Sequence, residues 1–134
     1  MTGEQEVMLE EAAVMYVESP NGLAGAAAAF DRLEAHLPSL RGRRFYGTFQ
    51  RPAGPYRACV ALVPGDDPTA LGLPTWTIPG GKYARRKLPD REKRLPEIGT
   101  TFAQMSATCE PDASRPSIEF YRSQRELLLF LPVK

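Results

Sequence analysis

The sequence predicts an α+β domain in which a strand-helix-strand-strand module occurs twice, giving a mostly antiparallel sheet with two helices that flank a central groove. The predicted elements follow the same order in two halves of the chain, about 7–64 and 71–134. Short echoes support this internal duplication, since Phe45-Tyr46 corresponds to Phe120-Tyr121. With 134 residues, the chain has the length of a single domain, 1–134.

The first half begins with an apolar segment, 7–17, that predicts a strand ending at Ser19-Pro20. Hydrophobic residues then recur at helical spacing over 23–37, with Asn21 as the expected N-cap and Pro38 as the end of the pattern. The half closes with two strands, predicted at 43–50 and 56–63.

The second half follows a run of turn residues, 64–68, which predicts a linker. A long strand begins near Trp76 and is expected to bulge at Pro79-Gly80-Gly81 before it ends at Leu88-Pro89. Hydrophobic residues every three or four positions over 95–105 predict the second helix, with Pro96 in its first turn. The closing strands are predicted at 116–121 and 127–133.

Net charge and composition argue against nucleic-acid binding and membrane association. The formal charge is +1, and 43% hydrophobic and 25% charged residues are ordinary values for a globular domain. The net charge therefore provides no overall attraction to nucleic acid. Because the N-terminus lacks the features of a signal peptide and no segment is apolar enough to span a membrane, we expect a cytoplasmic protein without a membrane contact.

Neither a metal site nor a cofactor is predicted. Cys59 and Cys109 form no C-x-x-C pair and are interpreted as reduced, mostly buried thiols. His36 is the only histidine, which favours a structural or surface role over catalysis. The segment Pro79-Gly80-Gly81 does not match a phosphate-binding glycine motif, and a turn or bulge explains it.

Glu119 is the first candidate site residue, because it lies between large hydrophobic residues on a predicted strand. Ile118 and Phe120 share one face of that strand, so Glu119 and Tyr121 share the other. This second face is either exposed to solvent or turned toward a partly covered cavity. The neighbouring strand, 127–131, is apolar on both faces, which favours the cavity. There, desolvation would shift the carboxyl group toward its protonated form and an arriving cation would restore the carboxylate.

Several aromatic residues are candidates for stacking on a flat or cationic ligand. The alternative for each of them is packing in the hydrophobic core. The predicted ligand-binding set is Glu119, Tyr121, Trp76, Tyr83, Tyr46 and Phe102.

The same segments resemble the GyrI-like small-molecule-binding family over nearly the whole chain from about Val7. The resemblance is carried by the runs Gly42-Arg43-Arg44-Phe45-Tyr46-Gly47, Tyr56-Arg57-Ala58-Cys59-Val60, Ile78-Pro79-Gly80-Gly81-Lys82-Tyr83-Ala84, Pro116-Ser117-Ile118-Glu119-Phe120-Tyr121 and Leu131-Pro132-Val133-Lys134. It implies the duplicated fold of the effector-binding domains of multidrug-sensing transcription regulators. In those domains a buried glutamate late in the sequence recognises lipophilic cations among aromatic rings, and Glu119 matches that position.

Three functions follow as expectations. The leading one is a stand-alone module that binds a hydrophobic, aromatic or cationic small molecule between the two helices. The resemblance also implies a hydrolase of reactive cyclopropane-containing natural products, with Glu119 as base or acid and with Tyr121 or Trp76 orienting the ligand. The third is a protein-interaction module such as a gyrase inhibitor, with the acidic N-terminal strand or the basic segment 82–94 as its contact. No helix-turn-helix is expected before Val7, so direct DNA binding is not expected.

Overall fold

Eight strands form one sheet in the computed structural model, which describes residues 5–50, 54–89, 97–122 and 126–134. In chain order, the strands are β1 (Gln5–Leu9), β2 (Ala12–Glu18), β3 (Phe45–Phe49), β4 (Tyr56–Ala61), β5 (Thr75–Ile78), β6 (Gly81–Pro89), β7 (Ser117–Tyr121) and β8 (Glu126–Pro132). The helical elements are η1 (Gly22–Gly25), α1 (Ala26–Ala35), α2 (Pro68–Leu71) and α4 (Ile98–Thr108). All paired strands are antiparallel, in the order β1-β6-β8-β7-β3-β4-β2-β5. The predicted α+β class with a mostly antiparallel sheet is confirmed.

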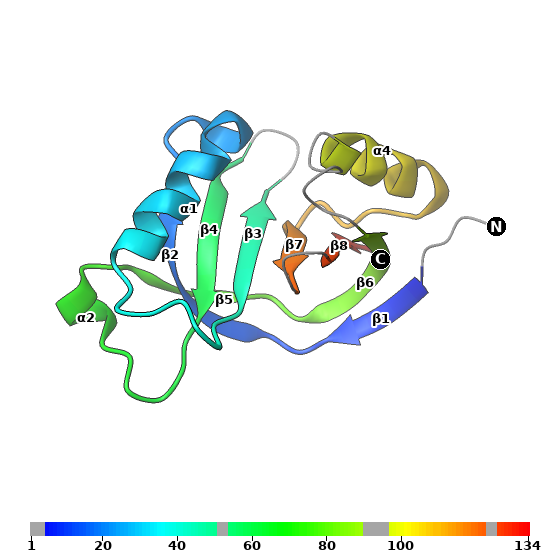
Figure 1. Ribbon diagram of the computed structural model, residues 1–134. Helices are drawn as coiled ribbons and strands as arrows, with labels where there is room; N and C mark the ends of the chain where they lie inside the picture. The colour runs from blue at the N-terminus through cyan, green and yellow to red at the C-terminus, as the bar shows by residue number, and fades with distance from the viewer. Residues whose placement is uncertain (1–4, 51–53, 90–96, 123–125) are drawn as a thin grey trace.

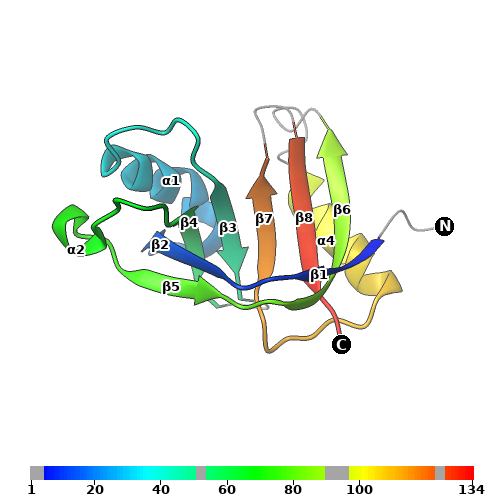
Figure 2. The same cartoon turned by 90° about the horizontal axis from the view of Figure 1, so that it is seen from below.

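The sheet is curled by two long arms, each made of two consecutive strands. β1 and β2 form one arm and β5 and β6 the other, and Figure 2 shows both arms crossing beneath the central strands. β1 pairs with β6, and β5 pairs with β2. A Cβ atom added to Gly80, in the break between β5 and β6, would lie 2.6 Å from the carbonyl oxygen of Leu9. The predicted long strand with a bulge at 79–81 is therefore wrong in detail, because the chain forms two strands, β5 and β6, with a break where the other arm lies close to Gly80.

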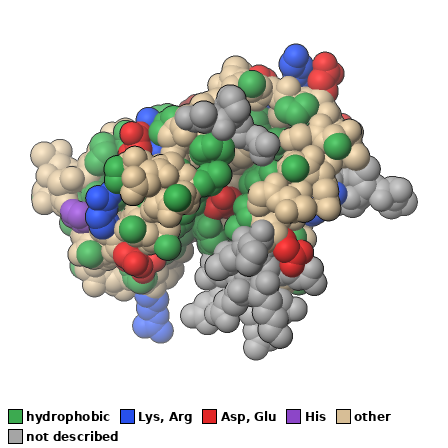
Figure 3. Space-filling model, turned by 90° about the horizontal axis from the view of Figure 1, so that it is seen from above, with side chains coloured by type: hydrophobic (Ala, Val, Ile, Leu, Met, Phe, Trp, Pro, Cys, Tyr) green, Lys and Arg blue, Asp and Glu red, His purple; other side chains and the backbone are tan. Residues whose placement is uncertain are grey.

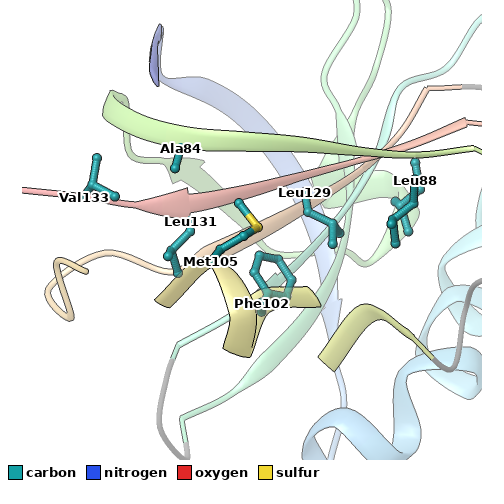
Figure 4. Close-up of a cluster of buried hydrophobic side chains, with 8 residues drawn as sticks. Ala84, Leu88, Phe102, Met105, Leu129, Leu131 and Val133 are labelled. Atoms are coloured by element: carbon teal, nitrogen blue, oxygen red, sulfur yellow. The ribbon is translucent and has the colours of Figure 1, made fainter. Parts of the chain in front are cut away.

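Both long helices lie on the same face of the sheet, one over each side (Figure 1). α1 packs on β2 and β4, and α4 packs on β8. The cluster under α1 consists of Met15, Ala29, Leu33, Leu37, Ala58, Val60 and Leu73. In the cluster under α4, Phe102 and Met105 of the helix pack against Leu129 and Leu131 of β8 (Figure 4). The central strands β3 and β7 lie between the two helix-covered regions.

The opposite face of the sheet has its own hydrophobic cluster, which the curled arms help to cover. Its buried members are Val14, Cys59, Ile78, Tyr83, Ile118, Leu128 and Phe130. Cys59 is a free thiol, and burial raises its pKa to about 12, so it remains protonated. Cys109 is also free and is half-buried. The prediction of reduced thiols is confirmed.

Several local predictions need correction. The first strand is not continuous over 7–17, because it breaks at residues 10–11 where one arm bends. Asn21 does not cap α1, since its side chain makes no capping hydrogen bond and a 3-10 turn separates it from the helix. The predicted linker contains the start of α2, where Asp67 accepts a hydrogen bond from the Ala70 amide and Pro68 occupies the first turn. The predicted positions of Leu95 and Pro96 lie outside the described residues.

The order of strands and helices is the same in the two halves of the structure. β1, β2, α1, β3 and β4 correspond in sequence order to β5, β6, α4, β7 and β8. This order agrees with the predicted modules, and the internal duplication itself stays a prediction. Among the described residues, no helix combines the length and the hydrophobicity that a bilayer crossing requires.

Candidate functional site

Glu119 lies near the middle of β7, directly opposite Gly47 of β3. Its side chain lies on the helix-bearing face, since Tyr121, two residues away, packs against the cluster under α4. Only 6% of the residue is exposed. The interpretation of Glu119 as a solvent-facing residue is therefore not supported by its position.

Two tyrosine hydroxyl groups hold the carboxylate of Glu119. The Tyr121 hydroxyl donates a hydrogen bond of 2.6 Å to Oε1, and the Tyr56 hydroxyl donates one of 2.9 Å to the same oxygen. Tyr56 comes from β4 and is 1% exposed. In the described part of the chain, no lysine, arginine or histidine forms an ion pair with Glu119. The carboxylate thus has hydrogen-bond donors but no cationic partner there.

Gly47 makes this arrangement possible, because the Tyr56 side chain crosses β3 to reach Glu119. A Cβ atom at position 47 would lie 2.1 Å from the Tyr56 hydroxyl oxygen and 2.6 Å from Glu119 Oε1. Real Cβ atoms do not approach other atoms so closely. The absence of a side chain at this position therefore creates the space in which the carboxylate and the hydroxyl meet.

Phe30 of α1 fixes the rings that carry the two hydroxyl groups. Its ring meets Tyr121 edge to face at a centroid distance of 5.3 Å, and Tyr56 in the same way at 6.4 Å. Such edge-to-face pairs each contribute roughly 0.5–1.5 kcal/mol beyond the burial of the rings. Phe30 therefore links the position of α1 to the geometry around Glu119.

Burial dominates the electrostatics of this group. It raises the pKa of Glu119 above its ordinary value, although the hydrogen bonds from Tyr121 and Tyr56 act in the opposite direction. Burial also raises the pKa of Tyr56, and the nearby Glu119 raises it further. Tyr56 therefore stays protonated and remains a donor, while the charge of Glu119 is sensitive to what binds beside it.

The helix-bearing surface is hollowed above the central strands. Figure 3 shows this face from above, with an acidic side chain at the bottom of a hollow that hydrophobic side chains surround. Glu119 is the one acidic residue of β3 and β7, both of which are fully described. The hollow and the tyrosine-bound carboxylate therefore belong to the same region between the two helix-covered sides.

The other aromatic residues predicted from the sequence lie elsewhere. Tyr46 stacks on Phe120 at a centroid distance of 5.0 Å, on the face opposite to Glu119. Trp76 packs on that face too, where it meets Tyr16 edge to face at 6.3 Å and stacks with the Arg57 guanidinium at 4.6 Å.

Tyr83 and Phe102 pack in two different clusters. Tyr83 is fully buried on the arm side, and its hydroxyl donates a hydrogen bond of 2.6 Å to the Pro79 carbonyl. Phe102 is 5% exposed in the cluster under α4, which Tyr121 borders. Of the predicted set, the structure thus brings Glu119 and Tyr121 into direct contact and places Phe102 on the same face, in the cluster beside Tyr121. Tyr46, Trp76 and Tyr83 lie on the opposite face.

Three residues around Glu119 were not predicted, namely Gly47, Tyr56 and Phe30. One signal was present for Gly47, because a glycine inside an aromatic strand often marks a close approach of another group. Tyr56 and Phe30 carry no such signal, since their proximity to Glu119 depends on strand pairing and on the placement of α1.

The remaining polar candidates have ordinary partners. The exposed His36 donates a hydrogen bond of 2.8 Å from Nδ1 to the Arg32 carbonyl. On β6, Lys82 lies 3.7 Å from Glu6 of β1, so the acidic and basic segments considered as protein contacts meet each other. Among the described residues, no group of three or more His, Cys, Asp or Glu side chains is arranged to hold a metal ion.

Comparison with known proteins gives similarity of fold only. No family model and no curated protein sequence matches the chain. Among solved structures, an integron cassette protein from the mobile metagenome of Vibrio cholerae has a TM-score of 0.77 and 13% identity, with 98% of this chain and 96% of that chain covered.

Two further solved structures of this fold carry functional information in their names. SAV2435 bound to tetraphenylphosphonium has a TM-score of 0.62 and 17% identity, with 98% of this chain and 93% of that chain covered. A hydrolase from Listeria innocua has a TM-score of 0.58 and 13% identity, with 98% of this chain and 91% of that chain covered. The chain therefore has a fold on which another protein binds a hydrophobic cation.

Proposed function

We propose that this protein binds a hydrophobic organic cation in the hollow above β3 and β7, with Glu119 as the anionic anchor. The observation that carries this proposal is a buried carboxylate that two tyrosine hydroxyls hold in place and that has no cationic partner among the described residues. A buried and incompletely compensated charge destabilises a fold, so its presence is most simply explained by a ligand that compensates it.

The geometry suits a positively charged ligand in three ways. At about 4 Å and an effective dielectric constant of 20, a unit cation and the Glu119 carboxylate attract by about 4 kcal/mol. The two hydroxyl groups hold the carboxylate in one position before the ligand arrives, which lowers the entropic cost of binding. The rings of Tyr121 and Phe30 provide aromatic surface beside the anion, and aromatic faces attract cations as well as hydrophobic groups.

The fold comparison supports the same class of ligand. SAV2435, which has this fold, was solved with tetraphenylphosphonium, a bulky cation that four aromatic rings surround. The resemblance of the Pro116-Ser117-Ile118-Glu119-Phe120-Tyr121 segment to effector-binding domains points in the same direction. The neighbour and the resemblance support the class of ligand, and the buried carboxylate of Glu119 supports the place where the cation binds.

Glu119→Gln is the direct test of the anchor. Glutamine keeps the size of the side chain and an oxygen that can accept both tyrosine hydrogen bonds, but it has no charge. With tetraphenylphosphonium as the probe, we expect isothermal titration calorimetry to show at least tenfold weaker binding to Glu119→Gln. The control is Asp31→Asn, which removes an exposed charge from α1 and should retain wild-type affinity. Equal affinities of wild type and Glu119→Gln would remove Glu119 from the site.

The hydrolase is the second candidate function, and the short Tyr121–Glu119 hydrogen bond favours it. At 2.6 Å, the hydroxyl donates a charge-assisted hydrogen bond that holds the carboxylate in place as a general base. Glu119 would take a proton from water while the water oxygen bonds to the electrophilic carbon and the strained carbon–carbon bond of the cyclopropane breaks, with its electron pair passing to the activating group of the ligand. That group would then take the proton back from Glu119, so that one water molecule is added in total. Tyr121 would orient the reacting group.

Product analysis separates the two functions. An activated cyclopropane incubated with a hydrolase gains the mass of one water molecule, and Glu119→Gln should abolish this product while the ligand still binds weakly. Mass spectrometry that detects only unchanged ligand after prolonged incubation with wild type would contradict hydrolysis and leave cation binding as the function.

A further inference from the structure

The two oxygens of the Glu119 carboxylate have different surroundings. Oε1 accepts both tyrosine hydrogen bonds, at 2.6 and 2.9 Å. Within the described residues, Oε2 has no hydrogen-bond donor. An ionised carboxylate can accept about four hydrogen bonds, two on each oxygen. Oε1 is therefore occupied by hydrogen bonds within the protein, whereas Oε2 can still accept hydrogen bonds from a ligand.

An open carboxylate oxygen distinguishes between kinds of cation. A quaternary ammonium or phosphonium ion neutralises the charge but donates no hydrogen bond, so the lone pairs of Oε2 would stay unpaired after the ligand displaces water. A protonated amine neutralises the charge and also donates a charge-assisted hydrogen bond to Oε2. Buried acceptors that lose water without gaining a donor weaken binding strongly.

Ser117 provides a second polar atom without a partner on the same strand. Its Oγ is buried and has no hydrogen bond, and the whole residue is 3% exposed. Ser117 precedes Glu119 by two positions on β7 and therefore lies on the same helix-bearing face. Successive side chains on one face of a strand are spaced by roughly 6.5–7 Å. Buried hydroxyl groups without a protein partner are rare, and a water molecule or a ligand is the usual partner of such a group.

We propose that the site is selective for a hydrophobic ligand that carries a protonated amine, with its N–H group bonded to Glu119 Oε2, and a second polar group that Ser117 Oγ binds at a distance of about 7 Å along β7. This inference rests on the proposed function, since it names the class of cation that the same anchor takes. It differs from that function because it requires an N–H donor on the ligand. The proposed function alone would also allow quaternary cations, which have no N–H group.

A matched ligand pair tests the requirement for N–H donors. The two probes are a tertiary arylalkyl amine, whose nitrogen is separated from the ring by a methylene group and is protonated at neutral pH, and its N-methyl quaternary ammonium derivative. Wild type is expected to bind the protonated amine at least tenfold more tightly, and Glu119→Gln should reduce this preference to less than threefold. Equal or tighter binding of the quaternary ion would overturn the inference and leave the proposed function intact. If neither ion binds, the proposed function itself fails.

Substitution of Ser117 tests the second contact. The probe is a version of the amine that carries a hydroxyl group about 7 Å from the nitrogen. Ser117→Ala removes a buried polar atom that has no partner, so the melting temperature should stay the same or rise. Affinity for the hydroxylated amine should fall at least threefold, while affinity for the plain amine should not change.

Ser19→Ala is the matched control for that measurement. Ser19 is also buried, but its Oγ accepts a hydrogen bond of 3.2 Å from the Asn21 amide. This variant should lose thermal stability and keep its affinity for both amines. If Ser117→Ala instead behaves like Ser19→Ala, with a lower melting temperature and unchanged affinities, Ser117 is a structural residue and the second contact is wrong.

Discussion

Gly47→Ala is expected to lower the free energy of unfolding by about 2–4 kcal/mol, because the added methyl group enters the space that the Tyr56 hydroxyl and the Glu119 carboxylate occupy. The clash involves groups that cannot easily move. Tyr56 is buried, and Glu119 is held from two sides by hydroxyl groups. Displacement of the Tyr56 hydroxyl would break its hydrogen bond and leave the carboxylate with fewer donors. Ligand binding should be lost together with stability.

Gly99→Ala is the control for this substitution. Gly99 lies in α4, and an added Cβ atom there would meet no other atom within 4 Å. Alanine is the better helix former, so this variant should gain up to about 1 kcal/mol. Urea unfolding followed by circular dichroism measures both variants. A destabilisation of Gly47→Ala below about 0.5 kcal/mol would show that the neighbouring side chains relax easily, and would contradict the tight packing described around Glu119.

Glu119→Gln is expected to make the unliganded protein more stable at neutral pH, by on the order of 1–3 kcal/mol, even as it weakens cation binding. The pKa of Glu119 is raised in the folded state, above the ordinary value of 4.5 that it has in the unfolded chain. The folded state therefore holds the proton to higher pH. Stability contributed by this group decreases as pH rises through the window that begins at 4.5, and the loss remains at neutral pH.

The difference in stability between wild type and Glu119→Gln isolates this effect. Carboxyl groups with lowered pKa, such as Asp66 and Asp112, lose their contribution as pH falls, but they are present in both proteins and cancel. Chemical denaturation from pH 4 to pH 8 should therefore give curves that converge at the acidic end and separate as pH rises. A stability gain that is the same at every pH would mean that Glu119 is not a titrating buried acid.

The general fold could be predicted because its signals are local. Turn residues separate the strands, and a hydrophobic repeat marks each long helix, so the order of elements and the α+β class follow from the sequence. The arms could not be predicted in the same way. Whether the segment 7–17 is one strand or two depends on its pairing with β5 and β6, whose paired residues lie sixty or more positions later in the chain.

The site could be predicted only where it depends on one strand. Alternation along β7 correctly placed Glu119 and Tyr121 on one face, because side chains on a strand alternate between its two faces. Tyr56 reaches the carboxylate from another strand across Gly47, and this contact depends on the pairing of β3 with both β4 and β7. Trp76 and Tyr46 are large aromatic residues with no local signal of their side of the sheet, and both lie on the face opposite to Glu119.

The exchange of arms has a consequence for how this molecule gains and loses its structure. β1 belongs to the first half of the chain but pairs with β6 of the second half. In the same way, β5 of the second half pairs with β2 of the first half. Each half thus depends on a strand from the other, so we expect the two halves to unfold together. Pairs such as Gln5 with Arg85 must close a very long loop, so we expect folding to be slow and concerted. A substitution that weakens β1 or β5 should therefore also destabilise the central strands that carry Glu119.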